Sequence, residues 1–281
     1  MKKVLITGAS GQLGRELTAL FLNHYFDVYG FSRQQMDVTN EEQVNDLMNE
    51  VQPDLVLHCA AYTKVDEAEL QAEQAYVVNA YGTKHVAIAA ERVGAKLVYV
   101  STDYVFDGTG KEPYHECSVP SPLGVYGKSK LAGEDFVKRF HTKCFIVRTS
   151  WLYGGQGSHF VNTMLALGKE KKELSVVDDQ IGSPTYVVDL AATILALIQT
   201  EKYGIYHVSN RGSCSWYEFA VAIFEEAGML VSVYPCTSED FPRRAKRPAY
   251  SVLKHARLEE QGFPKMKYWR EGLAHFLNQE G

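Results

Sequence analysis

Near its start the chain reads Val4-Leu5-Ile6-Thr7-Gly8-Ala9-Ser10-Gly11-Gln12-Leu13-Gly14, and a pattern typical of a helix follows. The order is therefore an apolar strand, a glycine-rich turn and a helix. Glycines let the backbone approach a pyrophosphate, whose charge then meets free N–H groups at the helix N-terminus. The spacing G-x-x-G-x-x-G is one residue wider at its first gap than the usual dinucleotide fingerprint. The stretch predicts a dinucleotide-binding turn, and a plain tight turn between strand and helix is the alternative.

The first half of the chain alternates short β-branched runs with helical patterns, which is typical of a parallel sheet with crossover helices. We expect strands at residues 3–7, 27–31, 55–58, 96–100 and 144–148. We expect helices at residues 13–22, 41–49, 72–92 and 128–140. Gly94 follows the third helix, where a left-handed cap is wanted.

After residue 148 the pattern loosens, and glycines and prolines divide the chain into shorter pieces. Residues 174–177 and 185–198 still look like a strand and a helix that belong to the same sheet. We therefore predict an α/β fold, a doubly wound parallel sheet of the Rossmann type with a smaller, interleaved C-terminal lobe that binds the substrate. The expected division is a dinucleotide-binding domain at 1–150, to which 174–200 return, and a substrate lobe mainly at 151–281.

The end of the second expected strand bears on the choice of dinucleotide. An NAD site usually has an acidic residue about 20 positions beyond the glycines, which binds the ribose 2′-hydroxyl. Here Ser32 and Arg33 occupy that place, and both could bind a 2′-phosphate. This favours NADPH and leaves NADH possible; an ordinary solvated loop cation is the alternative for Arg33.

A tyrosine and a lysine stand one helical turn apart in Tyr126-Gly127-Lys128-Ser129-Lys130. A nearby ammonium favours the phenolate and is expected to lower the tyrosine pKa, so that the phenol can protonate a carbonyl oxygen while hydride arrives at carbon. With 17 tyrosines in the chain, such a pair arises by chance, and Tyr250 and Lys254 form a second one. Position favours the first pair, because Ser101 and Thr102 follow an apolar strand whose carboxyl end faces the ligand crevice. We interpret the second pair as a structural helix or a substrate-side surface.

Composition and residue spacing argue against several other classes of protein. The 281 residues include 29 Lys or Arg and 34 Asp or Glu, a net charge of −5, which argues against a nucleic-acid partner. The longest apolar runs, such as 190–198, reach about half the length of a membrane span, so we expect a cytoplasmic protein with no membrane contact. Five cysteines without C-x-x-C spacing and nine histidines without H-E-x-x-H predict no disulfide framework and no metal site.

These features resemble the extended short-chain dehydrogenase/reductase superfamily and, more narrowly, the dTDP-4-dehydrorhamnose reductases, over nearly the whole chain. The glycine turn and the Tyr126/Lys130 pair are common to the superfamily. The narrower resemblance is carried by Ala61-Tyr62-Thr63-Lys64-Val65-Asp66, Ser101-Thr102-Asp103-Tyr104-Val105-Phe106 and Thr149-Ser150-Trp151. The overall resemblance ends with Gly182-Ser183-Pro184-Thr185-Tyr186 and Arg247-Pro248.

The resemblance implies a role for each matching residue. Tyr126 would donate the proton, Lys130 would support it and hold the nicotinamide ribose, and Thr102 would assist at the carbonyl. Thr102, Asp103 and Trp151 would contact the sugar. The resemblance implies further cofactor contacts from Gly11, Gln12 and Leu13 to the pyrophosphate, Asp37 and Val38 to the adenine, and Ala60, Ala61, Tyr62 and Thr63 to the ribose and phosphate region. The family is known to accept both NADH and NADPH.

Two further expectations come from the residues themselves. Trp151 follows the strand at 144–148, so its indole can stack on a sugar face, although a tryptophan is more often core. The basic cluster Arg243, Arg244, Lys246 and Arg247 is either solvated surface or faces the diphosphate of a nucleotide sugar, with Arg247 as the candidate. The acids at 66, 67 and 69 open a helix, where capping is the expected role.

The resulting hypothesis is reduction of the C4 ketone of a dTDP-activated 6-deoxyhexose by NAD(P)H, in a monomer or homodimer. Another nucleotide-sugar reductase or epimerase of the same superfamily is the first alternative. A non-enzymatic cofactor-binding subunit, resembling the regulatory subunit of methionine adenosyltransferase, is the second. The joint presence of Tyr126, Lys130 and Thr102 argues against the second alternative.

Overall fold

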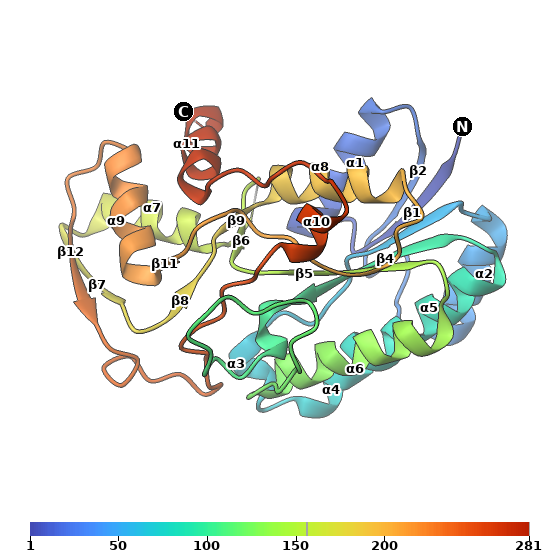
Figure 1. Cartoon of the computed structure of the whole chain (residues 1–281), viewed down its shortest axis with the longest axis horizontal. Coiled ribbons are helices and arrows are strands. Elements are labelled where there is room, and N and C mark those ends of the chain that lie inside the picture. The colour runs from blue at the N-terminus through green and yellow to red at the C-terminus, as the bar shows by residue number, and fades with distance from the viewer. Residues whose placement is uncertain (156, 281) are drawn as a thin grey trace.

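A twisted sheet of six parallel strands forms the centre of the molecule (Figure 1). The computed structural model describes residues 1–155 and 157–280. The strand order is β10-β5-β4-β3-β1-β2, and each neighbouring pair is parallel. The strands are β1 (Lys3–Thr7), β2 (Asp27–Phe31), β3 (Leu55–His58), β4 (Lys96–Thr102), β5 (Cys144–Thr149) and β10 (Gly204–His207). Because β2 and β3 flank β1 on opposite sides, the chain changes direction there and leaves a crevice at the carboxyl ends of β1 and β3.

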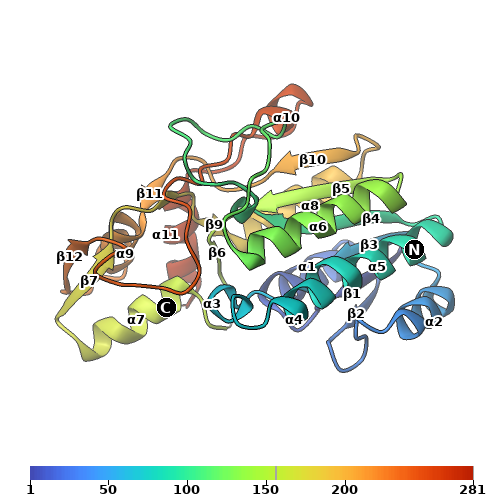
Figure 2. The same ribbon diagram turned by 90° about the horizontal axis from the view of Figure 1, so that it is seen from below.

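Helices cover both faces of the sheet, as Figures 1 and 2 show. On one face α1 (Gln12–Asn23) and α8 (Val187–Ile198) pack side by side, and on the other lie α2 (Glu41–Val51), α5 (Thr83–Arg92) and α6 (Val125–Phe140). Alternate residues of β1 serve the two layers: Val4 and Ile6 face the first core and Leu5 faces the second. Full burial on both faces is what a parallel sheet requires, so the predicted doubly wound α/β fold is confirmed.

The expected helix at 72–92 is interrupted. It consists of α4 (Ala72–Tyr76), a π-helical turn at Val77–Gly82 and α5. Gly94 follows with a φ of +73°, the left-handed conformation expected there. Two short elements lie near the strand ends: α3 (Val65–Ala68) and a 3₁₀ turn at Asp103–Val105.

The C-terminal half builds a lobe beside the carboxyl ends of the strands. Its helices are α7 (Phe160–Glu170), α9 (Trp216–Glu226) and α11 (Trp269–Glu280), while α10 (Ala256–Glu260) packs near β10. Its strands form three pairs, namely β7 (Glu173–Val177) with β12 (Ser232–Cys236), β8 (Ile181–Gly182) with β11 (Cys214–Ser215), and β6 (Leu152–Tyr153) with β9 (Thr185–Tyr186).

Our prediction that residues 174–177 join the central sheet was wrong, whereas helix 187–198 does pack on it. Strand β7 pairs only with β12 among the described strands, and the sixth place in the central sheet belongs to β10. The physical reason lies in the burial of β7, because Glu173 and Ser175 are exposed. A strand with one solvent-exposed face suits a small peripheral sheet better than the buried centre of a doubly wound sheet.

No helix within the described residues combines the length and the apolar character needed to cross a membrane.

Candidate active site

A cavity of about 730 Å³ opens at the carboxyl ends of β1, β3, β4 and β5, between the sheet and the lobe. Most of the residues selected from the sequence line it: Gly8, Gly11, Gln12, Leu13, Gly14, Arg33, Asp37, Val38, Ala60, Ala61, Tyr62, Thr63, Thr102, Asp103, Tyr126, Lys130 and Trp151. Ser32 and Arg247 are not among the lining residues. The cavity has the size of sites that enclose a whole organic ligand.

The glycine turn forms one wall of this cavity. Gly8 has a φ of +66°, and a Cβ there would lie 2.8 Å from the Ala60 backbone nitrogen. A Cβ at Gly14 would collide with the Gly8 carbonyl oxygen, which explains the third glycine. Helix α1 begins at Gln12 after Gly11, and no side chain caps it. Its first N–H groups are therefore available to an anion, as a pyrophosphate site requires.

The residues after β2 divide into two groups. Arg33 is exposed and lines the cavity, as a residue that binds a 2′-phosphate would. Ser32 instead points to its own loop, where its hydroxyl donates to Gln35 Oε1 at 2.8 Å. A phosphate contact from Ser32 would therefore require this bond to break, whereas Arg33 needs no such rearrangement.

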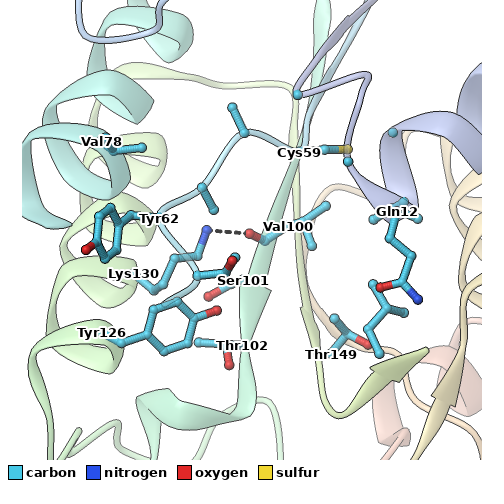
Figure 3. Close-up of a pocket in the computed structure, with 18 of the residues that line it drawn as sticks. Gln12, Cys59, Tyr62, Val78, Val100, Ser101, Thr102, Tyr126, Lys130 and Thr149 are labelled. Atoms are coloured by element: carbon cyan, nitrogen blue, oxygen red, sulfur yellow. Dashed lines mark hydrogen bonds between the residues drawn. The ribbon is translucent and has the colours of Figure 1, made fainter. Parts of the chain in front are cut away.

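Figure 3 shows Tyr126 and Lys130 projecting from α6 toward the end of β4, where Ser101 and Thr102 lie. The Lys130 ammonium donates to the Val100 carbonyl oxygen at 2.7 Å and lies 4.2 Å from the centre of the Tyr99 ring. These contacts fix the ammonium group beneath the cavity floor. The helix and the strand thus bring together the three residues that the sequence analysis selected for catalysis.

Burial, and not Lys130, dominates the acidity of Tyr126. Loss of solvent raises the pKa of Tyr126 to about 12, the Thr102 hydroxyl opposes this rise, and the Asp103 carboxylate adds to it. We expected Lys130 to lower this pKa, and that expectation was wrong for the free protein, because desolvation of the buried phenol outweighs the other influences on it. Burial also lowers the pKa of Lys130, to about 7. A high pKa keeps the phenol protonated, which a proton donor requires.

Asp103 is a buried carboxyl group at the cavity wall, 1% exposed. Its Oδ1 accepts a hydrogen bond from the Thr102 hydroxyl at 3.0 Å, while Oδ2 has no partner among the described residues. Burial raises the pKa of Asp103 to about 6, although the neighbouring hydroxyls of Ser251 and Thr102 act in the opposite direction. Oδ2 is also shielded from solvent, so a hydrogen bond from a ligand hydroxyl would require Asp103 or a neighbour to move.

Trp151 lines the cavity but does not present a free ring face. It stacks on Trp216 with ring centroids 3.5 Å apart and planes 8° apart. A Cβ at Gly182 would lie 2.5–2.7 Å from three atoms of the same indole. Trp151 also has a φ of +46°, a strained conformation of the kind that collects at functional sites. The expected stacking of this ring on a sugar would thus need Trp151 and Trp216 to separate.

Arg247 pairs with an acid instead of facing the cavity. Its two terminal nitrogens donate to Asp66 Oδ1 and Oδ2 at 2.7 and 2.8 Å. Arg247 would have to leave the Asp66 carboxylate before it could bind a diphosphate. The structure therefore does not support the expected contact. Asp66 and Glu67 lie in the first turn of α3 as expected, but no side chain caps that helix. Glu69 Oε1 instead accepts from the Val125 N–H, at the start of α6, at 2.8 Å.

The second tyrosine–lysine pair is not helical, contrary to one of our two interpretations. Tyr250 forms an isolated bridge with Ile181, and Leu253 forms another with Tyr114. Neither Tyr250 nor Lys254 is among the residues that line the cavity. Among the residues that the structure describes, no cluster of three or more acidic, histidine or cysteine side chains is arranged to hold a metal ion.

Several residues that line or support the cavity were not predicted from the sequence. Trp216 faces the cavity from the lobe, and Arg15 lines it near the glycine turn. Asn79, in the π-helical turn, bonds to the backbone N–H and carbonyl of Tyr62 at 2.7 and 3.1 Å and so fixes the loop after β3. A π-turn inside a helix often marks a functional position. No residue pattern at 77–82 predicts such a turn.

The chain matches the model of the family described as "RmlD substrate binding domain" over residues 1–281. It is 44% identical to the spore coat polysaccharide biosynthesis protein SpsK of Bacillus subtilis, covering 99% of this chain and 98% of that one. It is 41% identical to a dTDP-4-dehydrorhamnose reductase of Aggregatibacter actinomycetemcomitans, covering 97% of each chain. A solved structure of dTDP-4-dehydrorhamnose reductase from Bacillus anthracis in complex with NADP superimposes with a TM-score of 0.98, at 54% identity, over 99% of this chain and 100% of that one. The chain belongs to the RmlD substrate binding domain family.

Proposed function

We propose that this protein reduces the C4 ketone of dTDP-4-dehydro-L-rhamnose to dTDP-L-rhamnose with NAD(P)H, the last step of dTDP-rhamnose biosynthesis. The observation that carries the proposal is the convergence of Tyr126, Thr102 and Lys130 in the cavity that also contains the glycine turn. A carbonyl reductase needs a proton donor beside a dinucleotide, and this cavity offers both. The relatives described above, which bear the name of this reductase, support the choice of substrate.

The described residues fit a bound dinucleotide. Gly11, Gln12 and Leu13 place the uncapped start of α1 against the pyrophosphate, and Arg33 lies where a 2′-phosphate would bind. When bound, NAD(P)H supplies the hydride. Lys130 would hold the nicotinamide ribose, and Tyr62 and Thr63, in the loop after β3, would contact the ribose and phosphate region. We favour NADPH because Arg33 replaces the acid of an NAD site, with NADH as a second substrate.

Tyr126 and Thr102 act on the carbonyl oxygen of the sugar. Thr102 donates a hydrogen bond to this oxygen and orients it. Tyr126, protonated because of its raised pKa, transfers its proton to the oxygen as the negative charge develops there. The Lys130 ammonium stabilises the phenolate that remains, since an opposite charge nearby favours the charged form. Asp103 and Trp151, which both line the cavity, contact the sugar.

A cofactor-selectivity experiment tests Arg33. Arg33→Ala is expected to raise the KM for NADPH about tenfold or more, because a charge-assisted phosphate contact is lost, and to leave the KM for NADH unchanged. The measurement is steady-state kinetics with each cofactor in turn. Arg92→Ala is the control, since Arg92 is an exposed arginine that bonds to Asn45 and does not line the cavity. Equal losses with both cofactors would contradict a 2′-phosphate role.

The decisive assay follows the absorbance of the reduced nicotinamide with dTDP-4-dehydrorhamnose and each reduced cofactor. We expect faster oxidation than with GDP-linked or UDP-linked 4-keto sugars. An epimerase of the same fold would show no net oxidation of cofactor, and a non-enzymatic subunit would co-purify with a partner and turn over none of these sugars.

We further propose that the chain acts in the cytoplasm as a monomer or homodimer, without nucleic acid or membrane as a partner. We also propose that residues 1–150 form the dinucleotide-binding domain and 151–281 mainly the substrate lobe, with the helix at 187–198 returning to the sheet.

A further inference from the structure

A buried ion pair lies beneath the cavity and has no part in the reaction described above. Glu134 of α6 and Arg148 of β5 have side chains that are 0% and 1% exposed. Arg148 Nε and Nη2 donate to Glu134 Oε1 and Oε2 at 2.9 and 2.7 Å. Burying two charges costs desolvation that their attraction often only balances, so net stability is a weak reason for such a pair.

The Glu134 carboxylate is held on the same stretch of β4 as the Lys130 ammonium. Lys130 and Glu134 are four residues apart on α6 and so share one face of the helix. Lys130 donates to the Val100 carbonyl oxygen, and the hydroxyl of the next residue, Ser101, donates to Glu134 Oε1 at 2.6 Å. The strand continues at once to Thr102. The two helix residues are therefore anchored to consecutive strand residues directly below the reacting groups.

Burial works against a charge on Lys130, which is 2% exposed. It lowers the pKa of Lys130 to about 7, and the negative charge of Glu134 is the main influence in the opposite direction. The titratable groups that interact with or contact Lys130 come from α6, β4 and the end of β3: Tyr126, Glu134, Tyr99, His58 and Cys59.

Four of these five groups carry no charge near neutral pH. Burial raises the pKa of Tyr126 and of Cys59 to about 12, and it raises the pKa of Tyr99 as well. Burial lowers the pKa of His58 to about 3. Among the described groups that face Lys130, Glu134 thus supplies the negative charge that balances the ammonium.

We propose that Glu134 is a positioning residue for the reaction, whose carboxylate, held by Arg148 and Ser101, keeps Lys130 in its ammonium form beneath Tyr126. This rests on the reductase function proposed above, in which a charged Lys130 supports Tyr126 and holds the cofactor ribose. Lys130 is active in its protonated form. Its support of Tyr126 and of cofactor binding is therefore lost as the pH rises through the pKa of Lys130. Removing the carboxylate lowers that pKa, and the loss then begins at lower pH.

The test is the pH dependence of Glu134→Gln. We expect the basic limb of kcat/KM to move to lower pH by at least about one unit, with a tenfold or greater loss at about pH 8 and little change at about pH 6. NADPH affinity, measured by fluorescence titration at the same pH values, should weaken with the same displacement. The affinity measurement needs no sugar, so it tests Glu134 even if the wild type fails to reduce any substrate and the proposed function falls.

Two further variants keep the test decisive. Glu134→Gln leaves the Arg148 charge unpaired and can fail to fold, so Glu134→Gln/Arg148→Met replaces the whole pair by uncharged side chains. The double variant should show a displacement in the same direction but smaller, because the positive charge of Arg148, which opposes an ammonium on Lys130, is removed together with the carboxylate. Asp189→Asn breaks another buried carboxylate contact, with Lys267 at 2.9 Å, and neither residue is among the neighbours of Lys130 named above. Its pH profile should match the wild type. Wild-type profiles in both Glu134 variants, or an equal loss at every pH, would overturn the proposal.

Discussion

Tyr126→Phe is expected to lower kcat by about 10²- to 10⁴-fold, the usual contribution of a positioned proton donor. The substitution removes the hydroxyl that supplies the proton and keeps the ring, which packs edge-on against Tyr104 at a centroid distance of 5.6 Å. The affinity for NADPH should change little, since the pyrophosphate, adenine and 2′-phosphate contacts lie on other elements. We therefore expect a large loss of kcat, measured by steady-state kinetics, together with an unchanged affinity for NADPH, measured by fluorescence titration.

The chain provides a matched control in its second tyrosine–lysine pair. Tyr250→Phe removes a hydroxyl from a tyrosine that does not line the cavity, and its kcat should equal that of the wild type. An unchanged kcat in Tyr126→Phe, or equal losses in both variants, would refute the assignment of Tyr126 as proton donor.

Gly11→Ala is expected to fold normally and to weaken NADPH binding by about tenfold or more. Gly11 has a φ of −74°, which any residue adopts, and within the protein its Cβ would approach only the Gly8 carbonyl oxygen, at 3.1 Å. The added methyl group would instead occupy the space between the turn and the pyrophosphate, where close backbone approach is needed. Isothermal titration gives the affinity, and thermal unfolding reports the fold.

Gly94→Ala should show the opposite pattern. Gly94 has a φ of +73°, and a Cβ there would meet nothing within 4 Å. Alanine in this conformation costs about 1 kcal/mol of stability, while the cofactor site is untouched. A Gly11→Ala protein that binds NADPH as tightly as the wild type would show that the turn does not contact the pyrophosphate.

The predicted sheet was accurate where local pattern and burial agree. Strand β1 and the glycine turn are adjacent in sequence, so a few residues contain the whole βα unit. The same holds for Thr102 at the end of β4 and for Tyr126 and Lys130 on one face of α6. Parallel strands end at one edge of the sheet, and residues that follow them in sequence must therefore meet there.

The errors concern contacts between segments that lie far apart in the chain. Arg247 and Asp66 are 181 residues apart, and no local pattern shows that they pair. Trp151 and Trp216 approach each other only because the lobe folds back over the end of β5. Strand β7 has a strand-like sequence, but its neighbour β12 begins more than 50 residues later.

The sequence by itself determined the doubly wound sheet and the meeting of the glycine turn, Thr102 and Tyr126 at one edge of it, because each depends on residues within one or two turns or strand ends. Only the tertiary structure decided which of these side chains carry a charge and which charges are already paired with another residue. Burial raised the pKa of Tyr126 to about 12 and lowered that of Lys130 to about 7, the reverse of what their proximity suggested. It also directed Arg247 to Asp66 and placed Glu134 beneath Lys130. The physical reason is that desolvation and pairing depend on everything that surrounds a group, and that environment exists only once the chain has folded.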